Sequence, residues 1–599
     1  MDTLARADAA TSAARSTTSY RLGLAALLVA SALVLLAGNG GSSVFDRDEA
    51  RFALAVREMR ARGEFVVPTN WGKPRTHKPI LAYWLALGSE RVLGPGEFAW
   101  RLPSALCGLL SICLTAAIAR SLFGERAGLR AGAILATALV FVLESKILTS
   151  DATLLASTTL SFWAWLRLRG ATRRAPLWRF LFWLGVGLGL LAKAVNVAFL
   201  IAAGCALSYL RSPWSRRGRT LLFVALGLGA LAVSFPGIAV LGPLVLALVA
   251  LCFLIVELRS SAVESSAKRL GWSWGVPLAL AIAALWFVPA LVRTHGSFWS
   301  EGVGHHLLGR TVTPFEGHRA LPGYYLLTTV AAFFPWAAFL PAALAQAWRE
   351  ARSQFLLAWI LGPWILDELI ASKLPHYVLV TFPALAVLVA AEWERRAHGE
   401  SRPTARIRVI ETALFAIPCL LLAVAGALLW RLEHPTIRAL ALALVVLALV
   451  LAARVAQLQA RGLSERLFST VLAGALALYL LLFLGLFPAL EPLRIAPALG
   501  AAVARLGRPA EPIHLIEFRP ESLGCTLPAG HPVVEDQTAV TRALAGARPG
   551  LFLVPNDARD PRFERIRAQY PGAWEVLAQV RGILFPRLAE REIWIVRRE

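Results

Sequence analysis

Long apolar runs separated by short polar segments fill the chain from about residue 21 to residue 488. The first run, near residues 21–38, has no charged side chain between Leu22 and Ala37, and runs of this kind are typical of membrane-spanning helices. Counting every run predicts about 13–15 transmembrane helices. The stretch 220–257 is a single long apolar run interrupted by Pro and Gly pairs, and we read it as a tight hairpin of two helices.

The polar segment that follows the first apolar run, residues 39–98, differs from the other loops in its length and its charge. Residues Asp48 to Arg62 repeat apolar side chains at a spacing of three to four, with arginines between them, which is typical of a helix lying in the membrane interface. Residues Lys78 to Leu93 have a similar pattern. The sequence therefore predicts two interfacial helices in the first outer loop.

After residue 490 the long apolar runs stop, and short β-like runs alternate with short helical patterns. The β-like runs are Ile513–Phe518, Leu551–Val554 and Ile593–Val596, and Phe563–Gln569 has a helical pattern. We therefore expect two domains, a transmembrane domain at residues 1–490 and a small α/β domain at residues 491–599. An odd number of spans would place the second domain outside, on the side opposite to the N-terminus.

Composition agrees with a polytopic membrane protein and excludes a soluble globular one. Of the 599 residues, 57% are hydrophobic and only 17% are charged, and the mean hydropathy is +0.61, more apolar than a soluble fold can bury. The net charge of +23 does not indicate nucleic acid binding, because the cations occur in short loops between apolar runs. The positive-inside rule and anionic lipid headgroups explain them better.

With this topology, the polar residues at the ends of spans gather on the outer face, although the loop 39–98 breaks the positive-inside rule there. A violation of this kind indicates a local function. The candidates that could carry chemistry are Asp48, Glu49, Arg51, Lys78, Tyr83, Asp151, Lys193, His305, Arg310, Lys373 and Tyr377. Carboxylates beside cations at a membrane surface suit chemistry on a lipid-linked phosphate, with a base to accept a proton and cations to hold the phosphate.

Most of these residues also have a simpler structural interpretation. Asp48 and Glu49 could only stabilise a helix N-terminus, Lys78 could be an interfacial lysine, and Asp151 could be an N-cap. Lys193 lies between two apolar runs, which makes it a functional candidate by default. His305 is weak evidence alone, since the sequence offers no further ligands for a metal site.

The order of the motifs is similar to that of glycosyltransferase family 39, within the GT-C superfamily. The resemblance rests on Asp48-Glu49-Ala-Arg51-Phe, His77-Lys78-Pro79, Thr149-Ser-Asp151, Lys193 and Ser372-Lys373-Leu-Pro-His-Tyr377, and it covers residues 20 to 490. Within the family, the chain most resembles the bacterial branch of the aminoarabinose lipid A transferases, and more distantly the protein O-mannosyltransferases. His77 and Ala194 depart from the pattern of that branch, where Glu and Gly are usual.

This resemblance implies a GT-C fold in the bacterial inner membrane, with the site and the C-terminal domain facing the periplasm. It implies a polyprenyl-phosphate sugar donor, a lipid or protein acceptor, membrane lipids as partners, and no nucleic acid. Carried over by position, Asp48 would be the catalytic carboxylate and Asp151 the second acid, while Lys78, Lys193 and Arg310 would contact phosphates and Tyr377 would line the donor cavity. No cofactor is required, although a divalent metal is possible.

Two alternatives stay open at this stage. A protein O-glycosyltransferase would use a Ser or Thr hydroxyl as acceptor, and the sequence cannot separate it from an enzyme with a lipid acceptor. A transporter or flippase of lipid-linked sugars would use the outer cations only to bind the phosphate. The absence of paired inverted repeats in the sequence weighs against a transporter.

Overall fold

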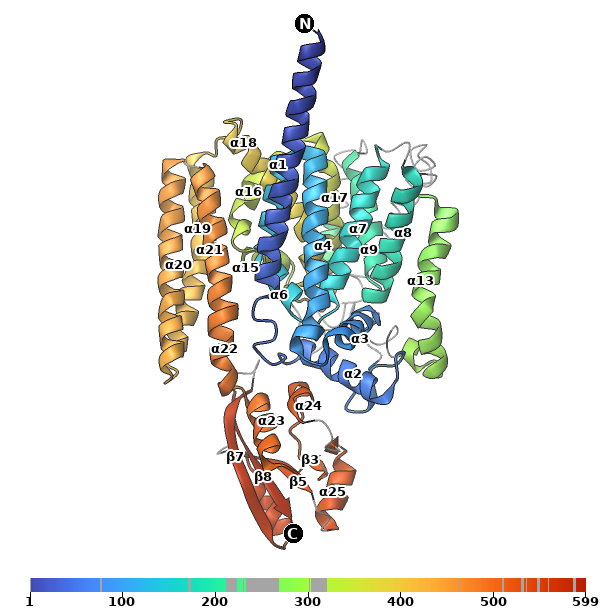
Figure 1. The fold of residues 1–599 in the computed structure, drawn as a ribbon, viewed down its shortest axis with the longest axis vertical. Coiled ribbons are helices and arrows are strands. Elements are labelled where there is room, and N and C mark those ends of the chain that lie inside the picture. Colours follow the sequence, from blue (N-terminus) through green and yellow to red (C-terminus); the bar gives the residue numbers. More distant parts are fainter. Residues whose placement is uncertain are drawn as a thin grey trace.

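A computed structural model gives the fold. It describes residues 2–75, 78–170, 174–211, 224–229, 231–232, 269–300, 302, 320–462, 464–508, 511–528, 533–534, 536–546, 550–557, 560–584 and 589–598. Long helices lie side by side in a bundle, and a small domain with a sheet lies beyond one end of it (Figure 1). The two short helices α2 and α3 lie between the bundle and this domain, at the end opposite to the N-terminus.

The helices of the first half follow the apolar runs of the sequence. They are α1 (Asp2–Leu36), α2 (Asp48–Arg62), α3 (Leu81–Leu93), α4 (Glu97–Phe123), α5 (Glu125–Ala136), α6 (Leu139–Lys146), α7 (Asp151–Leu168), α8 (Ala175–Ala192), α9 (Asn196–Arg211) and α13 (Trp272–Arg293). Two-residue strands β1 (Thr69–Asn70) and β2 (Lys73–Pro74) pair between α2 and α3. The helix expected at Asp48–Arg62 is confirmed with its bounds, and the second helix begins at Leu81 rather than Lys78. Their location in the membrane interface stays a prediction.

The second half of the bundle is more broken, with short 3₁₀ or π segments between the helices. Its elements are α15 (Tyr324–Ala332), η4 (Trp336–Phe339), α16 (Leu340–Ala347), η5 (Ala351–Ser353), α17 (Gln354–Glu368), η6 (Tyr377–Thr381), α18 (Phe382–Ala397), α19 (Ala405–Leu429), α20 (Pro435–Arg461), α21 (Ser464–Leu480), η7 (Leu481–Leu486), α22 (Phe487–Leu490) and η8 (Glu491–Leu493). Prolines account for part of this, because Pro335 directly precedes η4 and prolines lie in the first turns of α16 and α18, where they end a preceding run of backbone hydrogen bonds.

Eight helices among the described residues are long and apolar enough to cross a membrane, or nine if the bent pair α5 and α6 forms one span. The chain is thus a multi-pass membrane protein. The larger number of spans expected for the whole chain stays a prediction. The hairpin expected at 220–257 lies outside the described residues, apart from 224–229 and 231–232.

Small and aromatic side chains let the helices approach closely. An added Cβ at Gly362 on α17 would lie 2.3 Å from the backbone nitrogen of Ala203 on α9, so only glycine fits this contact. On the neighbouring α7, the Phe162 ring stacks on the Trp359 ring of α17 with 4.1 Å between centroids. These contacts pack the middle parts of α7, α9 and α17 together.

The C-terminal domain is the small α/β domain that the sequence predicts. Its sheet has the order β4-β3-β5-β8-β7, with β6 paired to β5; β3 is parallel to β4 and β5, and β8 is antiparallel to β5 and β7. The strands are β3 (Ile513–Leu515), β4 (Val533–Val534), β5 (Leu551–Asp557), β6 (Asp560–Pro561), β7 (Trp574–Leu584) and β8 (Ala589–Arg598); the helices are α23 (Ile495–Leu506), α24 (Glu521–Thr526), α25 (Gln537–Ala545) and α26 (Arg562–Gln569). The expected boundary at residue 490 itself stays a prediction.

Candidate functional site

The two acidic residues that begin α2 have different surroundings. Glu49 is 2% exposed and accepts two hydrogen bonds from the Arg101 guanidinium, at 2.6 and 2.9 Å. The same carboxylate accepts hydrogen bonds from the backbone N–H groups of Phe45 and Leu148. Both oxygens of the Glu49 carboxylate therefore accept hydrogen bonds from protein groups, which favours a positioning role over direct contact with a substrate.

Arg101 on α4 fixes the loop that leads into α2. Besides Glu49, its guanidinium donates to the carbonyl oxygens of Asn39, Ser42 and Ser43, at 2.6, 2.8 and 3.2 Å. A buried arginine is stable only when its donors are satisfied in this way. Sequence reasoning did not identify Arg101, although an arginine four residues into an apolar helix is a detectable signal.

Asp48, in contrast, faces outward, with 58% of its side chain exposed. The Arg51 guanidinium lies 3.8 Å from its carboxylate, as the one-turn spacing predicts. Partial enclosure raises the pKa of Asp48, but the positive charges of Lys78, Arg51 and Arg75 outweigh this effect and hold the pKa below its usual value. Asp48 is therefore an accessible, ionised carboxylate at neutral pH.

A second carboxylate lies nearby, paired with a lysine from another helix. Lys193 follows the last residue of α8 in an extended conformation, and its Nζ lies 2.6 Å from Asp151 Oδ1 at the first residue of α7. The Lys193 Nζ also lies 5.3 Å from the centroid of the Tyr377 ring. Both members of the pair are largely buried, with side chains 14% and 9% exposed.

His376 and Glu144 extend this polar region. His376 Nδ1 lies 3.9 Å from Glu144 Oε1, and Thr149 Oγ1 donates to the other Glu144 oxygen at 2.9 Å. Burial lowers the pKa of His376 to about 4, so the imidazole is neutral at physiological pH. The sequence analysis did not include Glu144; a carboxylate near the end of an apolar helix was the signal that could have found it.

Five residues influence one another through their charges, and we call them the interfacial charge cluster: Asp48, Lys78, Asp151, Lys193 and His376. The positive charge of Lys78 stabilises the ionised form of both Asp48 and Asp151. The charges of Asp151 and Asp48 raise the pKa of His376, whereas those of Lys193 and Lys78 lower it. Residues far apart in the sequence thus meet at one end of the bundle, as the topology predicted. Two carboxylates and two lysines in this cluster suit the binding of a phosphate and the activation of a hydroxyl.

Other candidates lie beside this cluster but are held by protein groups. Lys373 is buried and pairs with Glu368 at 2.8 Å, while donating to the Glu368 carbonyl at 2.7 Å. Tyr83 is fully buried under α2, where its hydroxyl accepts from Arg75 Nε at 2.7 Å and its ring stacks on Phe52. These geometries indicate that both residues support the site. His77, His305 and Arg310 lie outside the described residues.

The C-terminal domain contacts α2 on the side of Arg51. Glu521 at the start of α24 accepts from Arg51 Nε at 2.9 Å, so Arg51 bridges Asp48 and the C-terminal domain. Arg57 donates to three carbonyls at the end of α24, and Asp46 accepts from both the N–H and the hydroxyl of Ser522. We call this set of contacts the α2–α24 contact. It connects the C-terminal domain to the helix that carries Asp48.

Within the described ranges, no group of three or more His, Cys, Asp or Glu side chains could hold a metal ion. The carboxylates of the charge cluster have lysines as neighbours, and these can neutralise a phosphate without a metal.

Comparisons with known proteins agree with this geometry. Residues 77–240 match the family model "Dolichyl-phosphate-mannose-protein mannosyltransferase". The chain is 27% identical over 402 residues to the undecaprenyl phosphate-alpha-4-amino-4-deoxy-L-arabinose arabinosyl transferase of Serratia proteamaculans, covering 65% of this chain and 62% of that protein. It is 29% identical to the Pseudomonas aeruginosa protein of the same name, covering 61% and 58%. The match thus spans about three fifths of these relatives.

Among solved structures, the chain is similar to ArnT from Cupriavidus metallidurans bound to undecaprenyl phosphate. The TM-score is 0.71 at 19% identity, covering 97% of this chain and 98% of that one. The chain therefore has the fold of that protein, including the C-terminal domain. These matches confirm the resemblance to GT-C glycosyltransferases that the motifs indicated.

Proposed function

We propose that this chain, with its ArnT-like fold, is a membrane glycosyltransferase that moves a sugar from a polyprenyl-phosphate donor to a lipid acceptor, with Asp48 as general base. The observation that carries the proposal is an accessible Asp48 carboxylate that lies 3.8 Å from the Arg51 guanidinium and is kept ionised by the positive charges of Lys78, Arg51 and Arg75. The similar ArnT structure holds undecaprenyl phosphate, and the relatives in Serratia and Pseudomonas are named for a sugar linked to that lipid.

The chemistry needs a single displacement at the anomeric carbon of the donor sugar. The acceptor hydroxyl attacks this carbon while Asp48 accepts its proton, and the bond to the phosphate oxygen breaks. Lys78 and Lys193 stabilise the negative charge that grows on the departing lipid phosphate. A phosphate leaving group already carries charge, so no general acid is required. A single displacement inverts the configuration of the sugar.

The site is proposed to face the periplasm. Basic side chains gather at the opposite end of the bundle, where α4 ends and α5 begins and where α18, α19 and α20 meet, as the positive-inside rule expects for a cytoplasmic face. A cysteine in place of the exposed Arg60 should react with a membrane-impermeant maleimide in spheroplasts. Protection of this position until the membrane is permeabilised would reverse the proposed orientation.

The function is tested by replacing Asp48 with asparagine in purified, reconstituted protein. Asn keeps the size of the side chain but cannot accept a proton, so transfer should fall by roughly 10²–10⁴-fold, the range for loss of a general base. Binding of a polyprenyl-phosphate sugar should survive. Glu58→Gln is the matched control, since Glu58 lies on the same helix but binds Thr69 and Gly72 instead of the charge cluster.

Two outcomes would contradict the proposal. Near-normal release of polyprenyl phosphate by a well-folded Asp48→Asn variant would exclude the general base. Movement of the intact lipid-linked sugar across the membrane, with no sugar transferred, would favour the flippase alternative. Mass spectrometry of the acceptor distinguishes a lipid product from a glycosylated protein, which is the remaining alternative among enzymes.

A further inference from the structure

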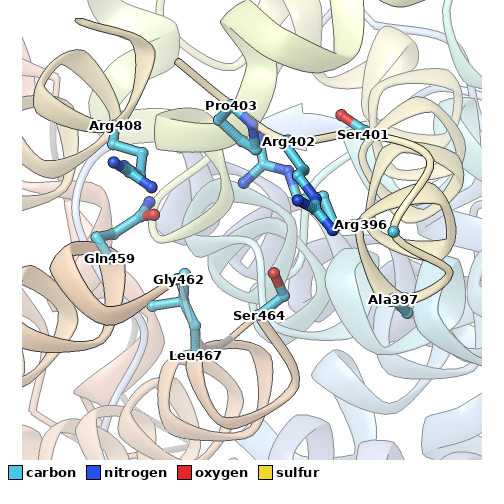
Figure 2. Close-up of a pocket in the computed structure, with 11 residues that line it drawn as sticks. Arg396, Ala397, Ser401, Arg402, Pro403, Arg408, Gln459, Gly462, Ser464 and Leu467 are labelled. Atoms are coloured by element: carbon cyan, nitrogen blue, oxygen red, sulfur yellow. The ribbon is translucent and has the colours of Figure 1, made fainter. Parts of the chain in front are cut away.

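At the end of the bundle opposite to the charge cluster, four helix ends surround a pocket of about 380 Å³. They are the C-terminal ends of α18 and α20 and the N-terminal ends of α19 and α21. Figure 2 shows the side chains around it. The lining includes Arg396, Ser401, Arg402, Arg408 and Gln459.

The lining contains three arginines and no carboxylate. Arg396 is neutralised by carboxylates behind the pocket, so the charge that favours an anion comes from Arg402 and Arg408. Arg396 is 7% exposed. Its guanidinium is held by Glu392 at 3.0 Å and by Glu411, whose carboxylate also accepts from Gln459 Nε2 at 2.8 Å. These contacts tie α18, α19 and α20 together and fix Arg396 and Gln459 as a rigid wall of the pocket.

Arg402 and Arg408 add positive charge in front of this wall. The Arg402 guanidinium lies beside that of Arg396, and the Arg408 guanidinium lies toward Gln459 (Figure 2). The N-terminus of α19 begins at Ala405, between the two arginines in sequence, and its helix dipole adds further positive potential.

The surroundings favour a lipid as the source of the anion. Val409 and Ile410 follow Arg408 directly on α19 and are 68% and 47% exposed, and large apolar side chains stay exposed farther along α19. A chain of this kind that crosses a membrane presents this face to acyl chains. A ligand with a phosphate head and apolar tails would therefore satisfy both the arginines and the neighbouring helix face.

We propose that this pocket binds the phosphate headgroup of an anionic membrane lipid, and that the lipid holds the ends of α18, α19 and α20 together. The site is separate from the charge cluster and does not depend on the proposed enzyme activity. Arg402 and Arg408 are the residues that contact the phosphate, and the buried pairs of Arg396 with Glu392 and Glu411 form the base of the pocket.

The test is native mass spectrometry of the full-length protein with added phosphatidylglycerol or phosphatidylcholine. The wild-type protein should retain phosphatidylglycerol in preference to phosphatidylcholine. Arg402→Ala combined with Arg408→Ala should reduce the retention of phosphatidylglycerol by roughly tenfold or more. The matched control combines Arg406→Ala with Arg466→Ala, which removes the same charge from exposed positions at the same end of the bundle but outside the pocket lining. It should retain the lipid normally.

Thermal unfolding in detergent provides the second measurement. Phosphatidylglycerol should raise the unfolding temperature of the wild-type and control proteins but not of the pocket variant. A cooperative unfolding transition of the pocket variant in the absence of lipid shows that this variant is folded. Equal losses of lipid in the pocket and control variants would overturn the proposal. So would stabilisation by inorganic phosphate equal to that by the lipid, because the site would then bind a free anion.

Discussion

The α2–α24 contact makes a prediction about how the C-terminal domain is held. Arg57 donates to the carbonyl oxygens of Gly524, Cys525 and Leu527 at 2.7, 3.1 and 2.8 Å. These carbonyl oxygens lie at the C-terminal end of the short helix α24, where no further helical N–H group is available to donate to them. Arg57→Ala removes all three hydrogen bonds at once, so α24 should separate from α2 more often.

The size of this effect follows from the contacts. A hydrogen bond to a charged group contributes about 1.5–3 kcal/mol, but three bonds from one guanidinium are not additive. We expect the free energy of opening to fall by about 2–4 kcal/mol. Since about 1.4 kcal/mol corresponds to tenfold, the open population should rise by roughly 30- to 700-fold.

Cys525 is a natural reporter of this opening. Its Sγ lies 3.7 Å from the Ala50 carbonyl oxygen of α2, and burial raises the pKa of the thiol well above its usual value, which suppresses its reactivity. The other five cysteines lie in apolar runs of the sequence, where a charged maleimide does not enter. The rate at which such a maleimide labels Cys525 in nanodiscs therefore measures the opening.

Arg62→Ala is the matched control. Arg62 lies on the same helix but donates to the carbonyls of Glu58 and Val67, away from α24, so labelling should match that of the wild type. If Arg57→Ala labelled Cys525 as slowly as the wild-type protein, Arg57 would not hold the domain. Equally rapid labelling in both variants would show a general loosening of α2 instead.

Two further predictions concern the charge cluster, and both are measured by unfolding in detergent. Lys193→Met leaves the buried Asp151 carboxylate without its partner and should cost about 3–5 kcal/mol of stability, whereas adding Asp151→Asn should recover most of it; an unchanged unfolding temperature in the single variant would contradict the pairing. His376 has a folded pKa of about 4, below its value of about 6.5 in the unfolded chain. Because the unfolded chain then binds the proton more readily, stability should fall as the pH drops from about 6.5 to about 4, by up to about 3 kcal/mol, and His376→Gln should abolish this part of the pH dependence.

Part of this site could be predicted from the sequence, because its residues lie at the ends of apolar runs. The order of the spans alone brings Asp48, Asp151 and Lys193 to one end of the bundle, and the helical spacing gives the bounds of α2. The C-terminal sheet followed similarly from short alternating runs such as Leu551–Val554, which became part of β5.

Contacts between distant segments could not be predicted in this way. Nothing in the spacing of Asp48 and Glu49 indicates that one faces outward while the other is paired with Arg101, since this depends on how α4 crosses α2. Lys373 occurs in a suggestive motif, yet its partner Glu368 lies only five residues before it and satisfies it locally. The contact of Arg51 with Glu521 joins residues 470 positions apart.

The pair formed by Lys193 and Asp151 has a consequence for turnover. Under the proposed function, the lipid phosphate that remains after transfer is a product that must leave before a new donor can bind. To contact Lys193, this phosphate has to compete with a carboxylate that already lies 2.6 Å from the ammonium group. Asp151 would then compete with the product phosphate for Lys193, which would limit product inhibition and shorten the time that the spent lipid occupies the site.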